Sequence, residues 1–373
     1  MAESGRSPLA DYHASQGATL GAYHGAIVPA RFTDPVGEHL AVRAASGLFD
    51  FSFRAQFALA GEDRVRFLHR IISNDVKSLA PGQGTYATLL TAQGHILADF
   101  HVFSADDRFI LATDGDLCEK AMKGLGRYII ADRVKIEPLE LFAIAFQGPE
   151  SRPLVSKTLH VDIPELPEYG HFATNYAGFA VRVVRRSSTG EEGYEVWVSA
   201  KGLMGVWGAA CGQAPTYGTL ACGFEALESL RIEAGIPRYG AELDEETMIH
   251  EAGLLNAVSF TKGCYVGQEI VERTRARGHA NWRLVGLIVE SPAPPRTTGY
   301  GPPPAPGEKL LADGKEVGEV TSACFSPTLA KTIALAYVRR EAAEPGTKLS
   351  LASGAAASVT ALPFYSKTPT NQK

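Results

Sequence analysis

The segment from residue 47 to residue 60, GLFDFSFRAQFALA, alternates between apolar and polar positions and is rich in aromatic side chains. An alternation with a period of two is typical of a β-strand with one buried face, so a strand is predicted here. The acidic turn at residues 61–63 follows, and apolar residues then recur at helical spacing between Val65 and Ile72. Acidic side chains in the first turn stabilise a helix through its dipole, so this pattern predicts a helix that ends near Asn74.

The period changes several times in the next part of the chain. Residues 82–103 predict two strands that are joined by a tight turn at residues 92–94. Residues 114–128 predict a helix, and residues 146–200 predict short strands between glycine turns. A helical stripe follows over residues 220–230, so helices and strands are mixed up to this point.

The pattern becomes uniformly strand-like after Trp282. Short strands are predicted over residues 285–290, 314–321 and 332–338, and in TIALAYV the large residues face one way and the small ones the other. A proline-rich loop, residues 292–307, separates the first two strands and cannot join a central ladder of hydrogen bonds. We therefore expect a separate all-β domain at the C-terminal end.

Composition and charge narrow the class of protein. A chain of 373 residues with 45% hydrophobic and 21% charged residues is long enough for two or three domains with sizeable cores. The net charge of −5 argues against binding of nucleic acid. The five cysteines are scattered without a C-x-x-C pair, which favours a reducing compartment and gives no zinc site.

No segment of the sequence predicts contact with a membrane. The N-terminal residues lack the apolar stretch of a signal peptide, and the longest aliphatic run, residues 284–289, is too short to cross a bilayer. We expect a cytoplasmic protein.

The motif TKGCYVGQEIVERTRARG, residues 261–278, places a single cysteine among a lysine, glycines and arginines. A neighbouring cation such as Lys262 favours the reactive thiolate form of Cys264, which predicts that this thiol is the most reactive of the five. Glycine on both sides of it allows positive φ or close approach of the backbone. The alternative is a buried cysteine beside a turn. A local cationic strip, or else an exposed strand face, is formed by four arginines that have Glu272 as the only nearby acid: Arg273, Arg275, Arg277 and Arg283.

Two carboxylates stand out on predicted strands. Glu195 follows a glycine-flanked acidic turn in SSTGEEGYEV and is able to accept two parallel hydrogen bonds from the N–H pair of a pterin-like ring. The alternative is a solvated hairpin turn. Asp99, in GHILADFHVF, is a lone acid between apolar neighbours, either a functional acid or a residue at the edge of a sheet.

The order of several motifs resembles that of a known family. KGCYVGQE is similar to the signature of the YgfZ proteins, the folate-binding branch of the glycine-cleavage T-protein family, and STGEEGYEV, LRIEAGIPRYGAELDEET and VGEVTSACFSPTLAKTIALAYV lie in the order of that family. The resemblance implies an α+β protein built as a three-domain ring. Two interleaved folate-binding domains would occupy residues 1–280 and a C-terminal β-barrel residues 281–365.

The resemblance also implies a ligand and its contacts. Tetrahydrofolate would bind in the central hole, with its pterin edge held by Glu195 and with Tyr86 and Tyr194 stacked on the ring or packed beside it. The remaining folate contacts that it implies are Lys262, Gln268 and Arg273. Asp99 and Cys264 would be the chemically active residues.

Two functions follow from this family. The YgfZ branch implies that the chain assists the assembly or repair of iron–sulfur clusters in client or carrier proteins through Cys264. The alternative is aminomethyltransferase-like transfer of a one-carbon unit to tetrahydrofolate, with Asp99 as general base. A scaffold that uses folate only structurally is a third possibility. Transferases typically carry an acid where this chain has Ala98 and a cation where it has Leu227, so we expect the iron–sulfur function and no complete transferase reaction.

Overall fold

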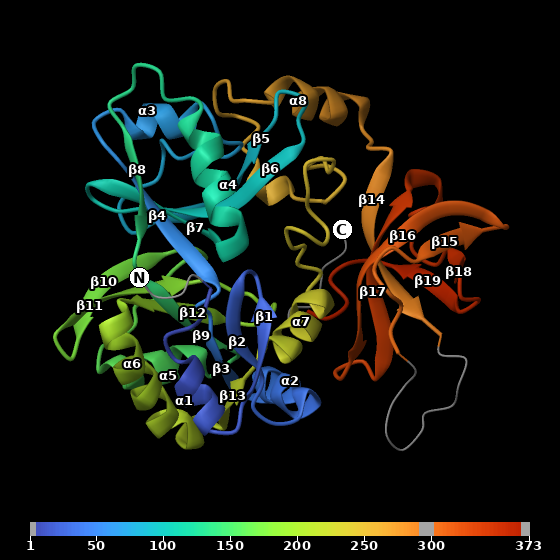
Figure 1. Ribbon diagram of the computed structural model, residues 1–373. Helices are drawn as coiled ribbons and strands as arrows, with labels where there is room; N and C mark the ends of the chain where they lie inside the picture. The colour runs from blue at the N-terminus through green and yellow to red at the C-terminus, as the bar shows by residue number, and fades with distance from the viewer. Residues whose placement is uncertain (1–4, 291–301, 367–373) are drawn as a thin grey trace. The chain divides into compact units, whose positions relative to one another are not determined.

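The computed structural model describes residues 5–290 and 302–366, so most of the predicted proline-rich loop lies outside the described residues (Figure 1). Contacts between residues divide the chain into two compact units. Unit 1 comprises the residues up to Ala92, Leu97–Leu227 and Asn256–Gln268, and unit 2 comprises Gln93–Ile96, Glu228–Leu255 and the residues from Glu269 onward. Each unit therefore draws on separate stretches of the chain, and the domain boundary at residue 280 stays a prediction.

A five-stranded sheet in unit 1 has the order β5-β6-β7-β4-β8. Its strands are β4 (Arg54–Ala60), β5 (Gly84–Leu90), β6 (Ile96–Ser104), β7 (Arg108–Asp114) and β8 (Lys135–Leu139). The helices α3 (Arg64–His69) and α4 (Gly115–Gly126) lie between these strands in the chain. The strands predicted over residues 82–103 are confirmed as β5 and β6, and Gly94 in the turn between them has a φ of +80°, a backbone conformation that favours glycine.

The second sheet of unit 1 has six strands in the order β10-β11-β12-β9-β3-β13. Its strands are β3 (Ser46–Asp50), β9 (Phe142–Gln147), β10 (His171–Tyr176), β11 (Phe179–Arg185), β12 (Gly193–Val198) and β13 (Thr219–Cys222). One of its faces forms a core with α5 (Ser151–Leu159) and α6 (Ala200–Gln213), in which Val155, Trp207 and Val196 are buried (Figure 1). All strands of the five-stranded sheet fall between β3 and β9 in the chain, so the expected interleaving of two α+β domains is confirmed.

The alternating segment 47–60 differs from its prediction as one strand. It contains all of β3 except Ser46 and the whole of β4, and these two strands belong to different sheets. The chain changes sheet at residues 51–53, where Phe51 and Phe53 remain buried. Apolar alternation continues through this link because its aromatic side chains are buried as well.

The N-terminal part of unit 1 adds a two-stranded sheet and two helices. These elements are α1 (Ala10–Ser15), β1 (Thr19–Tyr23), β2 (Ala26–Arg31) and α2 (Pro35–Ala44). The start of α2 follows from its sequence, because the Asp34 carboxylate accepts a hydrogen bond from the Gly37 N–H and Pro35 occupies the first turn.

Unit 2 contains a closed six-stranded barrel, which confirms the predicted C-terminal β-barrel (Figure 1). Its strands are β14 (Trp282–Val289), β15 (Lys309–Ala312), β16 (Lys315–Ser326), β17 (Lys331–Arg339), β18 (Lys348–Leu351) and β19 (Ala356–Thr360). In β17, Ala334 and Ala336 pack into the barrel core while Ile333 and Leu335 pack with Ile232 of α7 (Phe224–Glu233). The alternation predicted for TIALAYV is thus confirmed, and the small residues suit the narrow interior of a small barrel.

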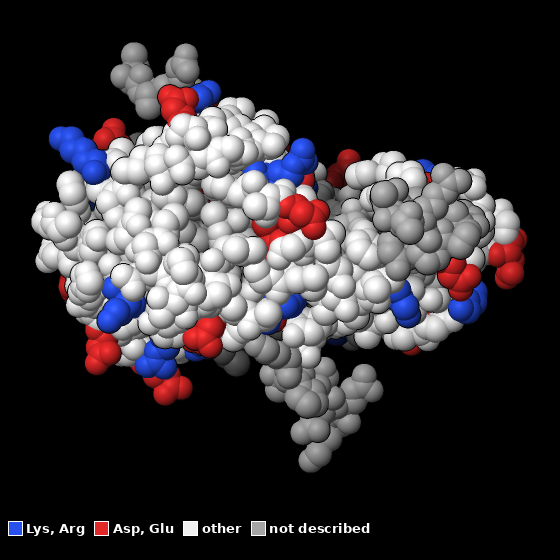
Figure 2. Space-filling model, turned by 90° about the horizontal axis from the view of Figure 1, so that it is seen from below, with Lys and Arg blue, Asp and Glu red and all other residues white. Residues whose placement is uncertain are grey.

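The arginine-rich end of the cysteine motif is a helix. Residues Gln268–Arg277 form α8, so the alternative of an exposed strand face is wrong for the arginines of this helix. None of the helices in the described part of the chain is long and apolar enough to cross a bilayer. On the face shown in Figure 2, basic and acidic side chains lie interspersed, in keeping with the net charge of −5.

Candidate functional site

Charged side chains from the two sheets of unit 1 meet in one place, which we call the charged cluster. Its members are Arg54, Asp99, Asp114, Arg186 and Glu195. Arg54 begins β4 and is paired directly with Asp114 at the end of β7. Glu195 lies on β12 of the other sheet, and Arg186 follows directly after β11. The cluster is therefore assembled from five stretches of chain that the two interleaved sheets bring together.

Glu195 is completely buried, and its two oxygens have different surroundings. Oε2 accepts a hydrogen bond of 2.9 Å from the indole Nε1 of Trp197. Oε1 lies 3.4 Å from Nε of Arg54 and 3.5 Å from Nη1 of Arg186, and it accepts no hydrogen bond within the described residues. A buried carboxylate requires compensating charge, and here two guanidinium groups supply it. The alternative of a solvated turn at Glu195 is therefore wrong.

Arg54 is held in place on several sides. Its Nη2 donates a hydrogen bond of 3.1 Å to the Ser188 hydroxyl, and its Nη1 lies 3.7 Å from Oδ1 of Asp114. The guanidinium also lies over the rings of Phe51 and Phe53, 5.0 and 5.6 Å from their centroids. These contacts orient the guanidinium before any ligand binds.

Asp99 lies on β6, which runs between β5 and β7, so its alternative placement at a sheet edge is wrong. The Tyr86 hydroxyl donates a hydrogen bond of 2.8 Å to its carboxylate. Burial raises the pKa of Asp99 to about 6, and repulsion from Asp114 adds to the rise, while Tyr86 and Arg186 oppose it. At neutral pH this carboxyl group is therefore mostly ionised and retains a small protonated fraction.

Aromatic rings line the cluster beside Asp99. Tyr86 and His101 are stacked with ring centroids 4.7 Å apart, and His101 in turn lies 5.0 Å from the ring of Tyr169. Burial, together with the positive charges of Arg186 and Arg54, holds the pKa of His101 well below its usual value. His101 is therefore neutral and contributes a polar aromatic surface.

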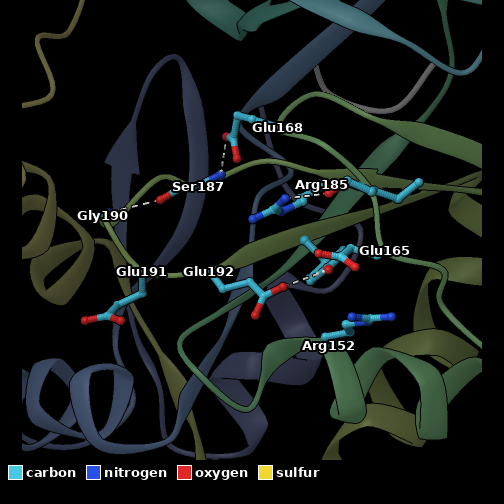
Figure 3. A pocket seen from close by; sticks show the side chains of 10 residues that line it. Arg152, Glu165, Glu168, Arg185, Ser187, Gly190, Glu191 and Glu192 are labelled. Atoms are coloured by element: carbon cyan, nitrogen blue, oxygen red, sulfur yellow. Dashed lines mark hydrogen bonds between the residues drawn. The ribbon is translucent and has the colours of Figure 1, made fainter. Parts of the chain in front are cut away.

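Tyr194 points away from the charged cluster. Adjacent residues on a strand face opposite sides, and Tyr194 is buried in the core with α5 and α6. Its hydroxyl donates a hydrogen bond of 2.9 Å to Glu192, at a polar pocket of about 500 Å³ that Arg152 and Arg185 also line (Figure 3). The structure thus brings Tyr86, Asp99 and Glu195 together, whereas Tyr194 lies on the other side of β12.

The cysteine motif forms a turn that Lys262 anchors. The ammonium group of Lys262 is buried and donates hydrogen bonds to the backbone oxygens of His69, Ile72 and Asn74. Burial lowers the pKa of Lys262 to about 8. The positive charge that was expected to activate Cys264 is therefore directed at three backbone carbonyl groups, at the end of α3 and in the loop after it.

Cys264 itself is exposed in this turn, whereas burial raises the pKa of Cys118 to about 11 and the pKa of Cys222 well above its usual value. The expected close approach of the backbone occurs at Gly267, where φ is +82° and a Cβ would lie 2.7 Å from the Thr91 oxygen.

Two further residues expected near folate lie on α8. Gln268 is its first residue and is half-buried, and Arg273 is exposed. Their role as ligand contacts stays a prediction. Within the described ranges, no group of three or more histidine, cysteine, aspartate and glutamate side chains is placed to hold a metal ion.

Sequence reasoning missed several members of the cluster. Arg54, Asp114 and Arg186 were not singled out, although each is a charged residue at the end of an apolar strand. A charged residue at the end of an apolar strand is a usable signal for a functional site, because strand ends lie where a sheet meets solvent or another element. The pairing of Arg54 with Glu195 spans most of unit 1 and has no local signature.

Comparison with known proteins identifies similar chains over the whole length. The model of the GCVT N-terminal domain matches residues 9–262, and that of the glycine cleavage T-protein C-terminal barrel domain matches residues 283–366. An aminomethyltransferase of Rippkaea orientalis is 33% identical, over 96% of this chain and 97% of its own. One of Streptomyces coelicolor is 30% identical, over 97% and 98%. The crystal structure of the glycine cleavage system aminomethyltransferase T from Bartonella henselae matches with a TM-score of 0.87 at 25% identity, covering 96% of this chain and 98% of that one.

These similarities overturn the function expected from the cysteine motif. Relatives that match over nearly the full length are named aminomethyltransferases, so the expected role in iron–sulfur cluster assembly through Cys264, with iron–sulfur client or carrier proteins as partners, is wrong. The two positions on which that expectation rests lie outside the charged cluster. Ala98 is completely buried and, because adjacent strand residues face opposite sides, points to the face of β6 opposite to Asp99. Leu227 is likewise buried, in α7.

Proposed function

Since the chain belongs to the glycine cleavage T-protein family, we propose that it transfers a one-carbon unit from an aminomethyl donor to tetrahydrofolate. The observation that carries the proposal is the charged cluster, in which Arg186 interacts both with a carboxyl group whose pKa is about 6 and with a buried, incompletely bonded carboxylate. Perturbed acids of this kind gather at catalytic sites more often than elsewhere. Tetrahydrofolate is a substrate in this reaction.

Glu195 is proposed to hold the pterin ring. Its Oε1 is a buried acceptor without a hydrogen bond among the described residues, and an unsatisfied buried carboxylate oxygen is costly. A ring N–H placed against it would provide the missing donor. Tyr86 and His101 offer stacked rings nearby, on which a planar ligand packs well.

Asp99 is proposed to act as the general base. With a pKa of about 6, it is mostly ionised at neutral pH and yet basic enough to take a proton. In the transfer, two C–N bonds form between the donor methylene and the folate amines, while the C–N and C–S bonds of the donor break. The two amine protons leave with ammonia and with the thiol of the lipoyl carrier. Asp99 would take one of these protons as the first C–N bond forms, and its hydrogen bond from Tyr86 would orient it.

A turnover assay tests this proposal. The protein is combined with an aminomethyl-lipoyl carrier and tetrahydrofolate, and the formation of methylene-tetrahydrofolate and ammonia is followed. Asp99→Asn removes the base but keeps the shape of the side chain, so we expect the rate to fall by about 10² to 10⁴. Asp106→Asn, at an exposed position, is the matched control and should retain the wild-type rate. Absence of turnover in the wild-type protein would refute the proposal, and full activity of Asp99→Asn would remove Asp99 from the reaction.

Three further residues that the family resemblance implies for folate binding are Lys262, Gln268 and Arg273. They are proposed to support binding indirectly, by shaping the turn and the helix in which they lie. Cys264 has no part in the proposed transfer.

A further inference from the structure

We infer that Arg54, together with Arg186, makes the site selective for a ring that presents a carbonyl oxygen directly beside a ring N–H. The inference rests on the proposed function, since it takes the ligand to be a pteridine, and deepens it by naming a residue that determines specificity. Such a donor–acceptor edge is a cyclic amide, or lactam.

The first step is the acceptor. Trp197, itself completely buried, donates its indole N–H to Oε2 of Glu195 and so fixes the carboxylate. Oε1 then remains as the side of the carboxylate without a hydrogen bond in the described chain. A ligand atom that sits against Oε1 has to be a donor.

The second step is the pair of donors next to that acceptor. Nε of Arg54 and Nη1 of Arg186 lie 3.4 and 3.5 Å from the same Oε1, and neither donates a hydrogen bond to a described residue. Both side chains are 9% exposed. A guanidinium group carries N–H donors only. A ligand atom that sits against these nitrogens therefore has to be an acceptor, and it has to be adjacent to the donor that meets Glu195.

The third step is that this pattern cannot invert. A glutamine or a hydroxyl group rotates to offer a donor or an acceptor, but arginine cannot. Arg54 is in addition held by Ser188, by the rings of Phe51 and Phe53, and by Asp114. The order of donors and acceptor is therefore set before the ligand arrives, which favours one ligand edge over its reverse.

The consequence concerns two nearly identical ligands. Tetrahydrofolate carries a ring carbonyl beside a ring N–H. Reduced aminopterin has an amino group in place of that carbonyl, and the neighbouring ring nitrogen loses its hydrogen. In this site the amino group of reduced aminopterin would place an N–H donor against the N–H donors of Arg54 and Arg186. Its unprotonated ring nitrogen would place an acceptor against the Glu195 carboxylate, which is also an acceptor. Sites built for hydrogen bonding reject such analogues strongly, because buried polar groups are left unpaired.

The test compares the affinity of the full chain for these two probes by calorimetry under anaerobic conditions. We expect the wild-type protein to bind tetrahydrofolate about 10² times more tightly than reduced aminopterin, or better. Arg54→Met keeps the length of the side chain and removes the donors, so the preference should shrink by at least about tenfold. Arg182→Met removes a half-buried arginine of β11, the strand that pairs with β12, and should keep the wild-type preference, because the Arg182 guanidinium donates to His171 and takes no part in the charged cluster. If Arg54→Met does not fold, Arg54→Lys, which keeps the charge without the planar fork, is compared in the same way and should also lose preference.

The outcomes separate this inference from the proposed function. Equal affinity of the wild-type protein for both probes, or an unchanged preference in the Arg54 variant, would overturn the inference and leave folate binding intact. If the wild-type protein bound neither tetrahydrofolate nor reduced aminopterin, the proposed function would be overturned, and the inference with it.

Discussion

At the scale of single residues, Asp99 shows how the site trades stability for chemistry. Burial and the charge of Asp114 oppose its ionised form, whereas Tyr86 and Arg186 favour it. The balance leaves its pKa at about 6, above the usual value for aspartate of about 3.9. The folded protein therefore keeps this proton at pH values at which the unfolded chain has already lost it.

This difference predicts that Asp99→Asn stabilises the protein. Above pH 6 the wild-type fold contains an ionised carboxylate that the unfolded chain tolerates better, so the variant should gain about 1 to 3 kcal/mol in free energy of unfolding at pH 7. The gain should decrease as the pH falls from 6 towards 4, because the carboxyl group is then protonated in the folded state and increasingly so in the unfolded one. Urea denaturation at pH 7 and pH 5 measures both effects, with Asp106→Asn as the control. A variant that is less stable than the wild type at pH 7 would contradict this account of Asp99.

Asp99 and Glu195 were recognisable in the sequence because each is a charge on an apolar strand. Arg54 has the same signal, but its place in an alternating segment is equally typical of an ordinary strand residue. Which oxygen of Glu195 lacks a donor depends on Trp197, two residues along the strand, and on Arg54 far away in the chain. Sequence cannot supply that geometry.

At the scale of elements, the turn that contains Cys264 depends on Lys262. The buried ammonium group joins this turn to the end of α3 and the loop after it, by hydrogen bonds to three backbone oxygens. Without the lysine, each of these backbone oxygens loses a hydrogen-bond donor, and a buried acceptor that lacks a donor lowers the stability of the fold. The lysine therefore has a structural role that its position beside a cysteine did not indicate.

Lys262→Met should destabilise the protein and loosen this turn. The loss of the three hydrogen bonds is expected to lower the free energy of unfolding by about 1 to 3 kcal/mol. Urea denaturation gives the magnitude, and hydrogen exchange at residues 259–267 shows whether the turn opens first. Lys77→Met, at an exposed lysine, should change neither quantity. If the two variants behaved alike, the anchoring role of Lys262 would be disproved.

Alternation predicted most of the strands, because burial on one face imposes a period of two within a few residues. The same reasoning failed for α8. Its arginines alternate in sequence, but their spacing records charge and not burial, and among its residues Val271 is the buried one. A short helix with a single buried side chain leaves almost no periodic signal.

At the scale of the whole chain, the interleaving of the two sheets of unit 1 was predicted from the resemblance to a family and from no local pattern. The five-stranded sheet is inserted between β3 and β9, so the segment 47–60 reads as one strand although it serves two sheets. The same resemblance gave the correct family but the wrong branch for the function. The functional expectation rests on the cysteine motif and on two positions, Ala98 and Leu227, whereas relatives that match at 30–33% identity over nearly the full length are named aminomethyltransferases.

If the charged cluster is the folate site, the loss of the Glu195 carboxylate must weaken binding, and calorimetric titration of tetrahydrofolate into the wild-type protein and into Glu195→Gln measures this. The amide has one acceptor oxygen where the carboxylate has two, so either Trp197 or the pterin meets an N–H donor in place of an acceptor, and Arg54 and Arg186 lose the negative charge of Glu195. We predict saturable binding by the wild type and an affinity at least about tenfold lower in the variant, with an unchanged fold by circular dichroism. Equal affinities of the two proteins would show that folate does not bind at the charged cluster.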